Sequence, residues 1–378
     1  MDKLLYVSMS LEKSNYGGSI VSRANLKGIK ANDRLQVKEV AIVRKEEGVY
    51  AWELLAKSSK VKTAINNLSG YAGRLNAAIF AKIKDIVQEY QPDTLYLDSS
   101  MLGSLAEWCK RAHPDINVVT FFHNVEVDFE VDRIKSGKVQ FFPSLISTTI
   151  AEKKAVKYSD TIVTLHQADA DRLYQLYQRK ADFCVPVCIV DEPITEETLH
   201  AADTAQDRPF RVGFIGTAFF ANTQAAEYIS QKIAPAFAGE SDVEFVIAGN
   251  GFEGYAAKLD KKNLKTYGYV ESLADFYKNV DVILSPITTG AGMKVKVAEA
   301  LKYNKKVIAS PFTLIGYEQA LDSNDIVSSD SLDEYVAAIK KFKSLRSVPS
   351  SSRRLFEQYY SDSACADYFK KIFNPSQS

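Results

Sequence analysis

A glycine-rich turn followed by two lysines and a glutamate distinguishes the stretch SPITTGAGMKVKVAEALKYNKKVIAS (285–310). The apolar run DVILSPI (281–287) directly before the turn predicts a buried parallel strand. Gly290 and Gly292 then supply a small, flexible turn in which backbone N–H groups can approach an anion. This order of strand, glycine turn and helix is typical of a phosphate-binding site.

The helix after this turn is predicted to begin near Gly292 or Met293, so that Lys294 and Lys296 fall in its first turn. The helix dipole disfavours each of these two cations in the first turn by about 0.3–1 kcal/mol. Two lysines there therefore indicate that an anion binds with them. Glu299 follows about two turns into the same helix.

A histidine follows another apolar strand, in the segment FFHNVEVDFEVDR (121–133). Ligands bind beyond the carboxyl ends of strands in open α/β sheets. His123 is therefore a candidate for orienting a hydroxyl group or for acting as a base, because its pKa lies near neutrality. Glu126 in the same loop is the second candidate for an acid or base. The structural alternatives are a histidine held by the next loop and an ordinary surface carboxylate.

A pair of glycines, Gly17 and Gly18, follows the first predicted strand, and a helix is predicted to open at about Ser19. In a Rossmann-like half this turn presents backbone amides to a ligand, although a plain tight turn has the same sequence. Asn25, about two turns into the helix, is predicted to be exposed.

The charge balance excludes a strongly basic or acidic partner. Lys+Arg and Asp+Glu are equal at 47 each, so no field of one sign indicates nucleic acid. The four cysteines match no zinc or disulfide spacing and are predicted to be buried free thiols of a reducing cytoplasm. They are Cys109, Cys184, Cys188 and Cys365. Asp169 and Asp171 lie at a predicted helix start, where capping explains them better than a metal site does.

No stretch of the sequence approaches the ~18 apolar residues of a membrane span. The first ten residues also lack the pattern of a secretory leader, so a cytoplasmic location is expected. The basic segment KKAVKY (153–158) and the aromatic segment QFFPSL (140–145) could together form a surface for an anionic membrane at its inner face. The alternative is a solvated amphipathic helix.

Apolar strand-like runs alternate with amphipathic helical segments along the whole chain, which predicts an α/β fold of two doubly wound, Rossmann-like halves. The strands predicted in the first half are 4–9, 35–43, 94–100, 117–123, 161–166 and 183–190. The expected organisation is an N-terminal domain at 1–195, a linker at 196–209, a C-terminal domain at 210–345, and helices at 346–378 that could cross back onto the N-terminal domain.

Several segments of the second half resemble the donor-nucleotide domain of bacterial glycosyltransferases with the GT-B fold, those of group 1 and family 4-like enzymes of surface polysaccharide synthesis. The segments are GAGMKVKVAEAL with KKVIASPFTLIGYE, RVGFIGTAFFANTQAAEYISQKIAPAF (211–237), VEFVIAGNGF (243–252) and TYGYVESLADFYKNVDVILSPI (266–287). Together they cover roughly Arg211 to Glu318 in the family's order and spacing. His123, Asn124 and Glu126 are similar to the family's "HN.E" segment.

The resemblance implies two Rossmann-like domains whose parallel sheets face each other across a cleft. It assigns the donor diphosphate to Lys294, Lys296 and the backbone amides around Gly290, Gly292 and Met293, and the donor ribose hydroxyls to Glu299. It also assigns Gly216, in the first turn of the C-terminal domain, to the donor site, and it places Gly17 and Gly18 close to the donor's diphosphate or the acceptor. Two positions depart from the commoner family pattern: Asn222 stands where many relatives have a basic residue, and Ala291 stands where many have the first glutamate of a Glu-x7-Glu pair.

The expected activity is transfer of a sugar from a nucleotide-diphosphate donor to a hydroxyl acceptor, a glycan or a lipid-linked oligosaccharide. The family's enzymes of this fold imply no metal and no cofactor other than the nucleotide-sugar substrate. The alternatives are a nucleotide-sugar epimerase of the same architecture, which needs acid and base carboxylates around the sugar, and a non-catalytic subunit that only binds the nucleotide sugar. The sugar, the base, the acceptor and the anomeric outcome stay open at this point.

Overall fold

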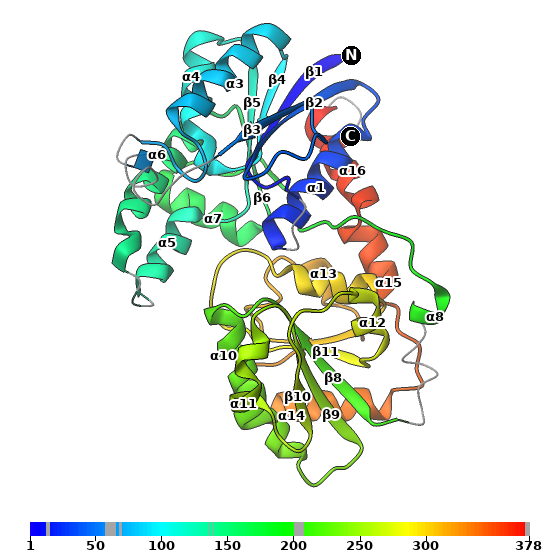
Figure 1. Ribbon diagram of the computed structural model, residues 1–378. Helices are drawn as coiled ribbons and strands as arrows, with labels where there is room; N and C mark the ends of the chain where they lie inside the picture. Colours follow the sequence, from blue (N-terminus) through cyan, green and yellow to red (C-terminus); the bar gives the residue numbers. More distant parts are fainter. Residues whose placement is uncertain are drawn as a thin grey trace. The chain divides into compact units, whose positions relative to one another are not determined.

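The computed structural model of the chain describes residues 1–12, 16–56, 66–67, 70–135, 137, 139–199 and 208–374. The chain divides into two compact units, each built around a parallel sheet (Figure 1). The first unit comprises Met1–Val190, Gly290–Gly292 and Asp362–Ser378, and the second comprises Asp191–Thr289 and Met293–Ser361. Most of the expected linker at 196–209 lies outside the described residues.

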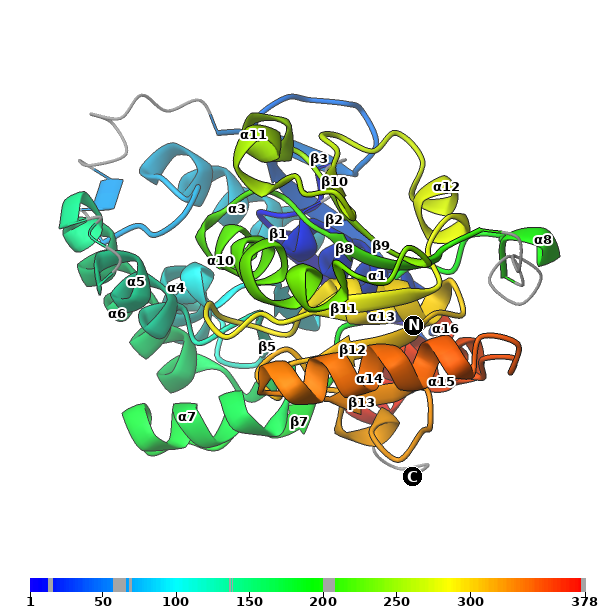
Figure 2. The same ribbon diagram turned by 90° about the horizontal axis from the view of Figure 1, so that it is seen from below.

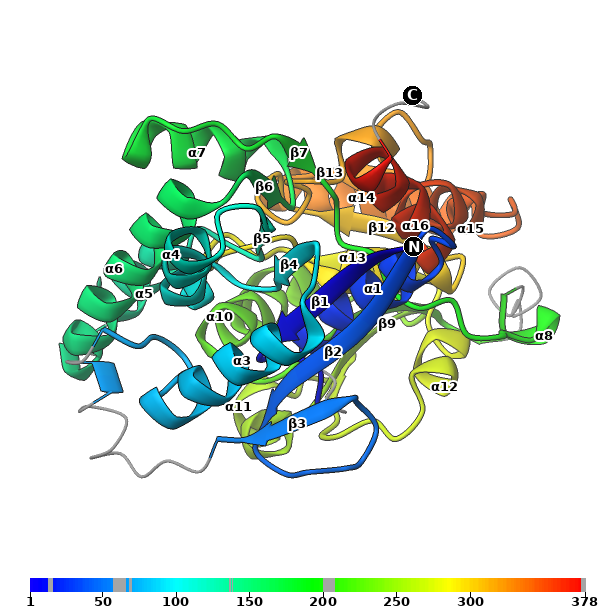
Figure 3. The same cartoon turned by 90° about the horizontal axis from the view of Figure 1, so that it is seen from above.

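The first unit has a sheet of seven parallel strands in the order β3-β2-β1-β4-β5-β6-β7 (Figure 3). The strands are β1 (Asp2–Ser8), β2 (Leu35–Val43), β3 (Trp52–Leu55), β4 (Thr94–Leu97), β5 (Asn117–Phe122), β6 (Thr161–Thr164) and β7 (Phe183–Cys184). The sequence did not predict β3, and it predicted a long strand at 183–190 where β7 has two residues. Pro186 explains the early end, because it has no N–H to continue the ladder. Cys184 was predicted to be buried, but it is exposed on this edge strand.

Helices cover both faces of this sheet, as βαβ connections require. They are α1 (Gly17–Lys30), α3 (Ala77–Tyr90), α4 (Gly103–Ala112), α5 (Glu126–Lys135), α6 (Phe142–Tyr158), α7 (Gln167–Tyr177) and α16 (Asp362–Phe373), with short 3₁₀ turns η1 (Ser100–Leu102) and η2 (Val139–Phe141). The helix α4 packs tightly on α6 at Gly103, where a Cβ atom would lie 1.9 Å from the Ala151 carbonyl oxygen. This contact therefore requires glycine.

The last helix, α16, packs against the first, α1, in the same unit (Figure 1). The contact is close at Gly28, because a Cβ atom there would lie 3.0 Å from the Cys365 sulfur. The Phe369 ring meets the Tyr96 ring of β4 edge-on, with 5.9 Å between the ring centroids. Asn25 was predicted to be exposed, but α16 buries it and its Oδ1 lies 3.6 Å from the Cys365 sulfur.

The second unit has six parallel strands in the order β10-β9-β8-β11-β12-β13. They are β8 (Phe210–Ile215), β9 (Val243–Ala248), β10 (Leu264–Thr266), β11 (Val282–Ser285), β12 (Lys306–Ala309) and β13 (Ile326–Ser328). Alternate residues of β8 and β9, among them Phe214 and Phe245, join one apolar core with residues of α10 and α14. Burial of that face holds the strand register.

The helices of the second unit include α13, which follows the glycine-rich turn, and α14, which lies along β12 (Figure 2). The α-helices are α8 (Glu196–Leu199), α10 (Phe220–Tyr228), α11 (Ala256–Leu259), α12 (Leu273–Lys278), α13 (Val295–Lys302), α14 (Leu332–Ser344) and α15 (Ser352–Leu355). The 3₁₀ and π turns are η3 (Ile229–Ile233), η4 (Ala234–Phe237), η5 (Phe252–Tyr255), η6 (Glu318–Ala320) and η7 (Phe356–Tyr360).

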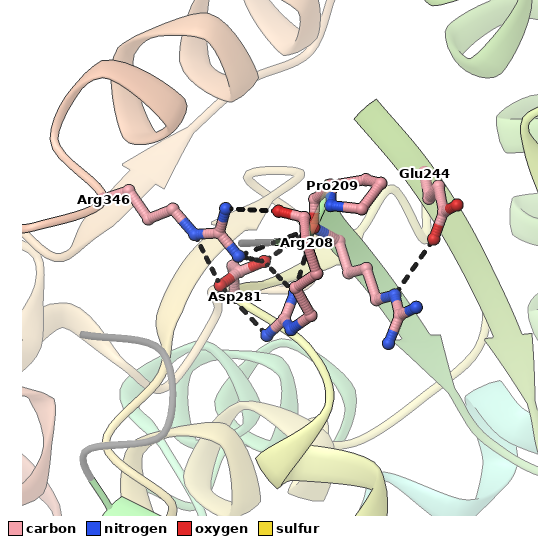
Figure 4. A network of polar contacts seen from close by, with 6 residues as sticks. Arg208, Pro209, Glu244, Asp281 and Arg346 are labelled. Atoms are coloured by element: carbon pink, nitrogen blue, oxygen red, sulfur yellow. Dashed lines mark hydrogen bonds and ion pairs between the residues drawn. The ribbon is translucent and has the colours of Figure 1, made fainter. Parts of the chain in front are cut away.

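A buried carboxylate at the amino-terminal edge of this sheet binds two arginines (Figure 4). Asp281 accepts hydrogen bonds from Arg208 Nη1 at 2.7 Å and from Arg346 Nε at 3.2 Å. It also accepts the backbone N–H of Arg211 at 2.7 Å. Arg346 donates in turn to the carbonyl oxygen of Arg208 at 2.8 Å. Asp281 therefore fixes the start of β11 to the chain entering β8 and to the end of α14, at the edge opposite the strand ends that carry the candidate site.

Candidate functional site

Two glycine turns meet at the carboxyl ends of β8 and β9. Gly216 donates its N–H to the Ala248 carbonyl oxygen at 3.0 Å. Gly249 has φ +135, and a Cβ atom there would lie 1.9 Å from the Gly216 carbonyl oxygen. A Cβ atom on Gly216 would itself lie 2.7 Å from Asn222 Nδ2 and 3.0 Å from Lys296 Nζ. Gly249 therefore allows the two turns to approach each other, and Gly216 leaves room for the Asn222 and Lys296 side chains above the strand ends.

Lys296 is the centre of this cluster. Its ammonium donates to Asn222 Oδ1 at 2.9 Å and lies 4.2 Å from the centroid of the Phe214 ring. Asn222 is buried, and its Nδ2 donates to the Thr217 carbonyl oxygen at 2.7 Å, which fixes the orientation of the amide. Burial lowers the pKa of Lys296 to about 7, against the opposing charge of Glu299. An anion arriving at this lysine would favour its charged form.

The helix α13 begins later than the sequence predicted. Its first residue is Val295, and Lys294 is its N-cap, so only Lys296 lies inside the first turn. Gly292 has φ +65, which keeps the chain before Lys294 out of the helical region. The Tyr317 hydroxyl replaces the usual first-turn contact, because it donates to the Lys294 carbonyl oxygen at 2.8 Å and accepts the Ala298 N–H at 3.2 Å. The buried tyrosine therefore sets where the helix begins.

The remaining residues predicted in this loop take different positions. Lys294 Nζ lies 4.5 Å from the centroid of the Phe312 ring, and Met293 is buried. Gly290 has φ +104, a backbone conformation that strains any residue with a side chain. The end of β11, which leads into the glycine-rich turn, is anchored from the segment after β12, because the Thr313 hydroxyl donates to the Ser285 carbonyl oxygen at 3.0 Å. This hydrogen bond thus fixes the strand end before the turn, and the positive φ angles of the glycines determine the backbone conformation of the turn itself.

Glu299 lies one turn beyond Lys296 on α13 and is partly exposed. Burial raises the pKa of Glu299, and the charges of Lys296 and Lys302 oppose the rise. In the part of the chain that the structure describes, its carboxylate has no hydrogen-bond partner. Two acceptor oxygens are therefore available for the hydroxyl groups of a ligand.

The first unit carries a second cluster where three neighbouring strands, β1, β4 and β5, end. His123, directly after β5, has its Nε2 3.2 Å from Asp98 Oδ1 and 3.1 Å from the Asp98 carbonyl oxygen. Asp98 is almost fully buried directly after β4, and its other oxygen accepts the Ser8 hydroxyl at 2.7 Å. Burial lowers the pKa of His123, but the charge and hydrogen bonds of Asp98 outweigh it, so that the pKa is raised overall. Asp98 therefore orients the imidazole and favours its protonated form.

Glu126 begins α5 beside this histidine. Its Oε1 accepts Asn124 Nδ2 at 3.1 Å, and burial raises its pKa. Its backbone N–H donates to Glu152 Oε2 at 2.8 Å, and the other Glu152 oxygen accepts the Tyr177 hydroxyl at 2.7 Å. Burial raises the pKa of Glu152 to about 7, although the bond from Tyr177 opposes the rise. Glu152 on α6 thus fixes the first residue of α5 through a hydrogen bond to its backbone N–H.

The two glycines after β1 lie inside α1, which begins at Gly17 and not at Ser19 as predicted. The N–H groups of Ser19 and Ile20 already donate to the Tyr16 carbonyl oxygen, at 3.0 and 3.2 Å. Gly17 and Gly18 therefore form the first turn of this helix, where their N–H groups need no intrahelical partner. A Cβ atom on Gly18 would lie 3.1 Å from the Tyr16 ring.

The sequence did not single out Asp98 or Glu152 as site residues. Asp98 follows the apolar residues of the run TLYLDSS (94–100), and an acidic residue at a strand end was the available signal. Glu152 gave no signal, because one glutamate in a lysine-rich helix is ordinary on a surface. Asn222 was noted only as a departure from the family pattern. Among the described residues, no group of three His, Cys, Asp or Glu side chains is arranged to hold a metal ion.

Comparison with known families and structures agrees with this architecture. Residues 209–343 match the sequence family described as "Glycosyl transferases group 1", a stretch that begins and ends within the second unit. The chain has the α/β fold of GT-B glycosyltransferases, as the structural likenesses below show. A search of curated proteins found no match to the sequence.

The structural likenesses extend over nearly the whole chain. Anabaena Alr3699/HepE in complex with UDP and glucose has a TM-score of 0.66 at 13% identity, covering 100% of both chains. WaaG, a glycosyltransferase involved in lipopolysaccharide biosynthesis, has a TM-score of 0.63 at 13% identity, covering 99% of this chain and 100% of its own. A putative UDP-N-acetylglucosamine 2-epimerase from Listeria monocytogenes has a TM-score of 0.58 at 10% identity, covering 99% of this chain and 97% of its own. At these identities the likeness defines the fold.

Proposed function

We propose that the protein is a glycosyltransferase that moves a sugar from a nucleotide-diphosphate donor to a hydroxyl acceptor, a glycan or a lipid-linked oligosaccharide, in surface polysaccharide synthesis on the cytoplasmic side of the membrane. The observation that carries this proposal is Lys296, a partly buried lysine among strand-end glycines in the segment that matches glycosyl transferases group 1. The HepE complexes with UDP and with UDP-glucose make UDP-glucose the first donor to test.

Departure of the nucleoside diphosphate leaves negative charge, which a preorganised cation can stabilise. Lys296 is held in place by Asn222. Because its pKa is lowered to about 7, negative charge that develops on the leaving group would increase the fraction of the lysine that is protonated. Lys294 and the N–H groups of the Gly290–Met293 turn are proposed to contact the same diphosphate. Glu299 would accept hydrogen bonds from the ribose hydroxyls with its two unoccupied oxygens.

The acceptor hydroxyl must lose a proton as its oxygen forms the new bond to the anomeric carbon. His123 is proposed to receive that proton, and the nucleoside diphosphate departs with the electron pair of the broken bond. Asp98 would hold the imidazole by Nε2 and stabilise the positive charge that develops on it. Glu126 is the second candidate for proton transfer, because burial raises its pKa. No metal and no cofactor is proposed to take part.

An epimerase of nucleotide sugars is the second candidate. Its support is the TM-score of 0.58 with the Listeria epimerase and the presence of two carboxylates, Asp98 and Glu126, beside His123. A subunit that binds the nucleotide sugar without turnover is the third. The three candidates differ in what becomes of the sugar, so one incubation separates them.

The decisive experiment incubates the full chain with UDP-glucose, with and without a panel of glycan and lipid-linked acceptors, and follows both UDP release and the sugar by NMR. Release of UDP together with a new glycosidic bond supports the transferase. A changed stereocentre on a sugar still attached to UDP would favour the epimerase. Saturable binding of UDP-glucose without either product would favour the binding subunit, and a parallel screen of other nucleotide sugars guards against the wrong donor.

A further inference from the structure

The helix α6 (Phe142–Tyr158) has a buried side and an exposed apolar side. The buried side packs on α4 and α5 with small and polar residues, among them Ala151, Glu152 and Ala155. Phe142, Ile146 and Ile150 point away from it and are 57%, 47% and 39% exposed. Their spacing of four residues puts all three on one side of the helix.

Lysines continue the same line toward the carboxyl end of the helix. Lys153 and Lys157 are exposed, and at ~100° per residue they fall within the same arc of about 80° as the three apolar residues. The one acidic residue of α6, Glu152, is fully buried on the other side. The exposed side of α6 is therefore apolar over its first turns and positively charged over its last.

The apolar part extends beyond the helix itself. Val139, in the turn η2 just before α6, is 70% exposed. The helices α5 and α6 lie side by side at the periphery of the first unit (Figures 1 and 3). The apolar face defined by Val139, Phe142, Ile146 and Ile150 thus lies on an outer helix of that unit and on the turn that precedes it.

We propose that this face, together with Lys153 and Lys157, binds the surface of an anionic lipid bilayer. Large apolar side chains on one side of a helix enter the boundary between headgroups and acyl chains, and lysines beside them attract anionic headgroups while their stems stay in the apolar layer. None of the described helices is long and apolar enough to cross a membrane. The binding proposed is therefore peripheral.

The geometry favours a bilayer over a protein partner. The face consists of three apolar residues on one side of α6 and Val139 in the turn before it, whereas a stable protein interface buries about 800 Å² on each partner and 20–30 residues a side. The exposed charges on α6 are all positive, which matches an anionic surface of wide extent. Lys154, on the flank, is already paired with Glu107 of α4 at 3.0 Å.

This surface and the proposed acceptor cluster share one helix. Glu152, on the buried side of α6, accepts the backbone N–H of Glu126 at the start of α5. A bilayer that holds α6 would therefore present lipid-linked molecules to the unit that carries His123. The membrane proposal itself stands without the proposed function, because it concerns binding to lipid and not turnover.

The test is flotation of the full chain with vesicles of phosphatidylcholine alone or mixed with phosphatidylglycerol. The wild-type protein is expected to float with the anionic vesicles, and far less with the neutral ones. Lys153→Gln with Lys157→Gln should weaken the anionic binding about 25-fold, since each lysine near such a surface contributes roughly fivefold. Phe142→Ser with Ile146→Ser should weaken it by about 10- to 100-fold.

Matched controls use the same substitutions elsewhere. Lys82→Gln changes an exposed lysine of α3, and Leu321→Ser changes a leucine of the second unit that is 41% exposed, and neither should alter flotation. Circular dichroism and the melting temperature establish that each variant is folded. Equal flotation of the wild type and both double variants would overturn the proposal, as would equal binding to neutral and anionic vesicles.

Sedimentation of the wild-type protein without lipid tests whether a second copy of the chain binds to this face. A dimer that Phe142→Ser dissociates would replace the bilayer with a second copy of the chain. UDP release from soluble substrates should be unchanged in the double variants, so failure of the membrane proposal and failure of the proposed function give different results.

Discussion

The strand ends of the two sheets each carry a basic side chain, but the surroundings of the two side chains differ. In the second unit a lysine, Lys296, lies among glycines, an asparagine and an aromatic ring. In the first unit a histidine, His123, lies against a buried carboxylate that is already bound to a serine. One cluster is built to receive an anion, whereas the other is built to receive a proton.

Burial lowers the pKa of the basic side chain in both clusters, but the net pKa shifts have opposite directions. It lowers the pKa of Lys296, because the charge of Glu299 compensates only in part and no carboxylate among the described residues forms an ion pair with that ammonium. In His123 the lowering by burial is exceeded by Asp98, and the pKa rises. A desolvated lysine without a close counter-ion is stabilised in its charged form when an anionic ligand binds. A histidine whose charge is already compensated by a neighbouring carboxylate can instead gain and lose a proton during a reaction.

The largest expected effect is that of His123→Ala. Loss of a general base lowers turnover by about 10²–10⁴-fold, and the donor KM should change little. Steady-state kinetics with the identified donor and acceptor measure both. His113→Ala is the control, because that histidine lies at the amino-terminal edge of the same sheet. Full activity of His123→Ala would leave the first cluster a structural one.

Lys296→Met is expected to weaken UDP binding by about 10- to 100-fold, since a charge-assisted hydrogen bond to phosphate contributes roughly 1.5–3 kcal/mol. The pKa of about 7 adds a pH dependence. The ammonium is charged below that value and neutral above it, so wild-type affinity for UDP should fall between pH 6 and pH 9. Titration calorimetry checks this, and Lys296→Arg should bind UDP with little dependence on pH in that range. A lysine outside the cluster, changed as Lys265→Met, serves as the control.

Asp98→Asn should reduce turnover by about tenfold and move its pH profile. Asp98 raises the pKa of His123, so its neutralisation lowers that pKa and extends the unprotonated, base-competent form to lower pH. The acidic limb of the kcat profile should therefore shift to lower pH. A lower kcat with an unmoved limb would mean that Asp98 only supports the fold or that His123 is not the base.

Glu299→Gln keeps the shape of the side chain and removes its charge. Hydrogen bonds to charged groups are stronger than neutral ones by about 1 kcal/mol, so the donor KM should rise about fivefold. The variant should melt at the wild-type temperature. If the affinity of UDP-glucose relative to that of glucose 1-phosphate is the same in the variant as in the wild type, Glu299 does not bind the ribose.

The smallest expected effect is that of metal removal. Lys296 and Lys294 supply the positive charge for the diphosphate, so activity in excess EDTA should equal that without it. Loss of activity that magnesium or manganese restores would contradict the proposal and would shift the charge compensation from the lysines to a cation.

The strands and the donor-side residues were the predictable part, because apolar runs, glycines and charges at helix starts are local signals. The first-unit cluster was not predictable as a whole. Asp98 meets His123 only because β4 and β5 are neighbours in register, and Ser8 joins them because β1 pairs with β4. Likewise, Glu152 is buried by packing between helices that no local pattern fixes. The start of α13 was predicted too early, because the Tyr317 hydroxyl that caps it lies far along the chain.

The packing of α16 on α1 has a consequence for synthesis on the ribosome. The segment Asp191–Ser361 is made between Met1–Val190 and the last part of the first unit, Asp362–Ser378. At ~5–20 residues per second the first part waits on the order of 10–30 s for the helix that covers Gly28 and Tyr96. During that interval the nascent first unit exposes the apolar surface of α1 to chaperones. A premature stop before Asp362 should therefore destabilise the part of the first unit that was translated before it.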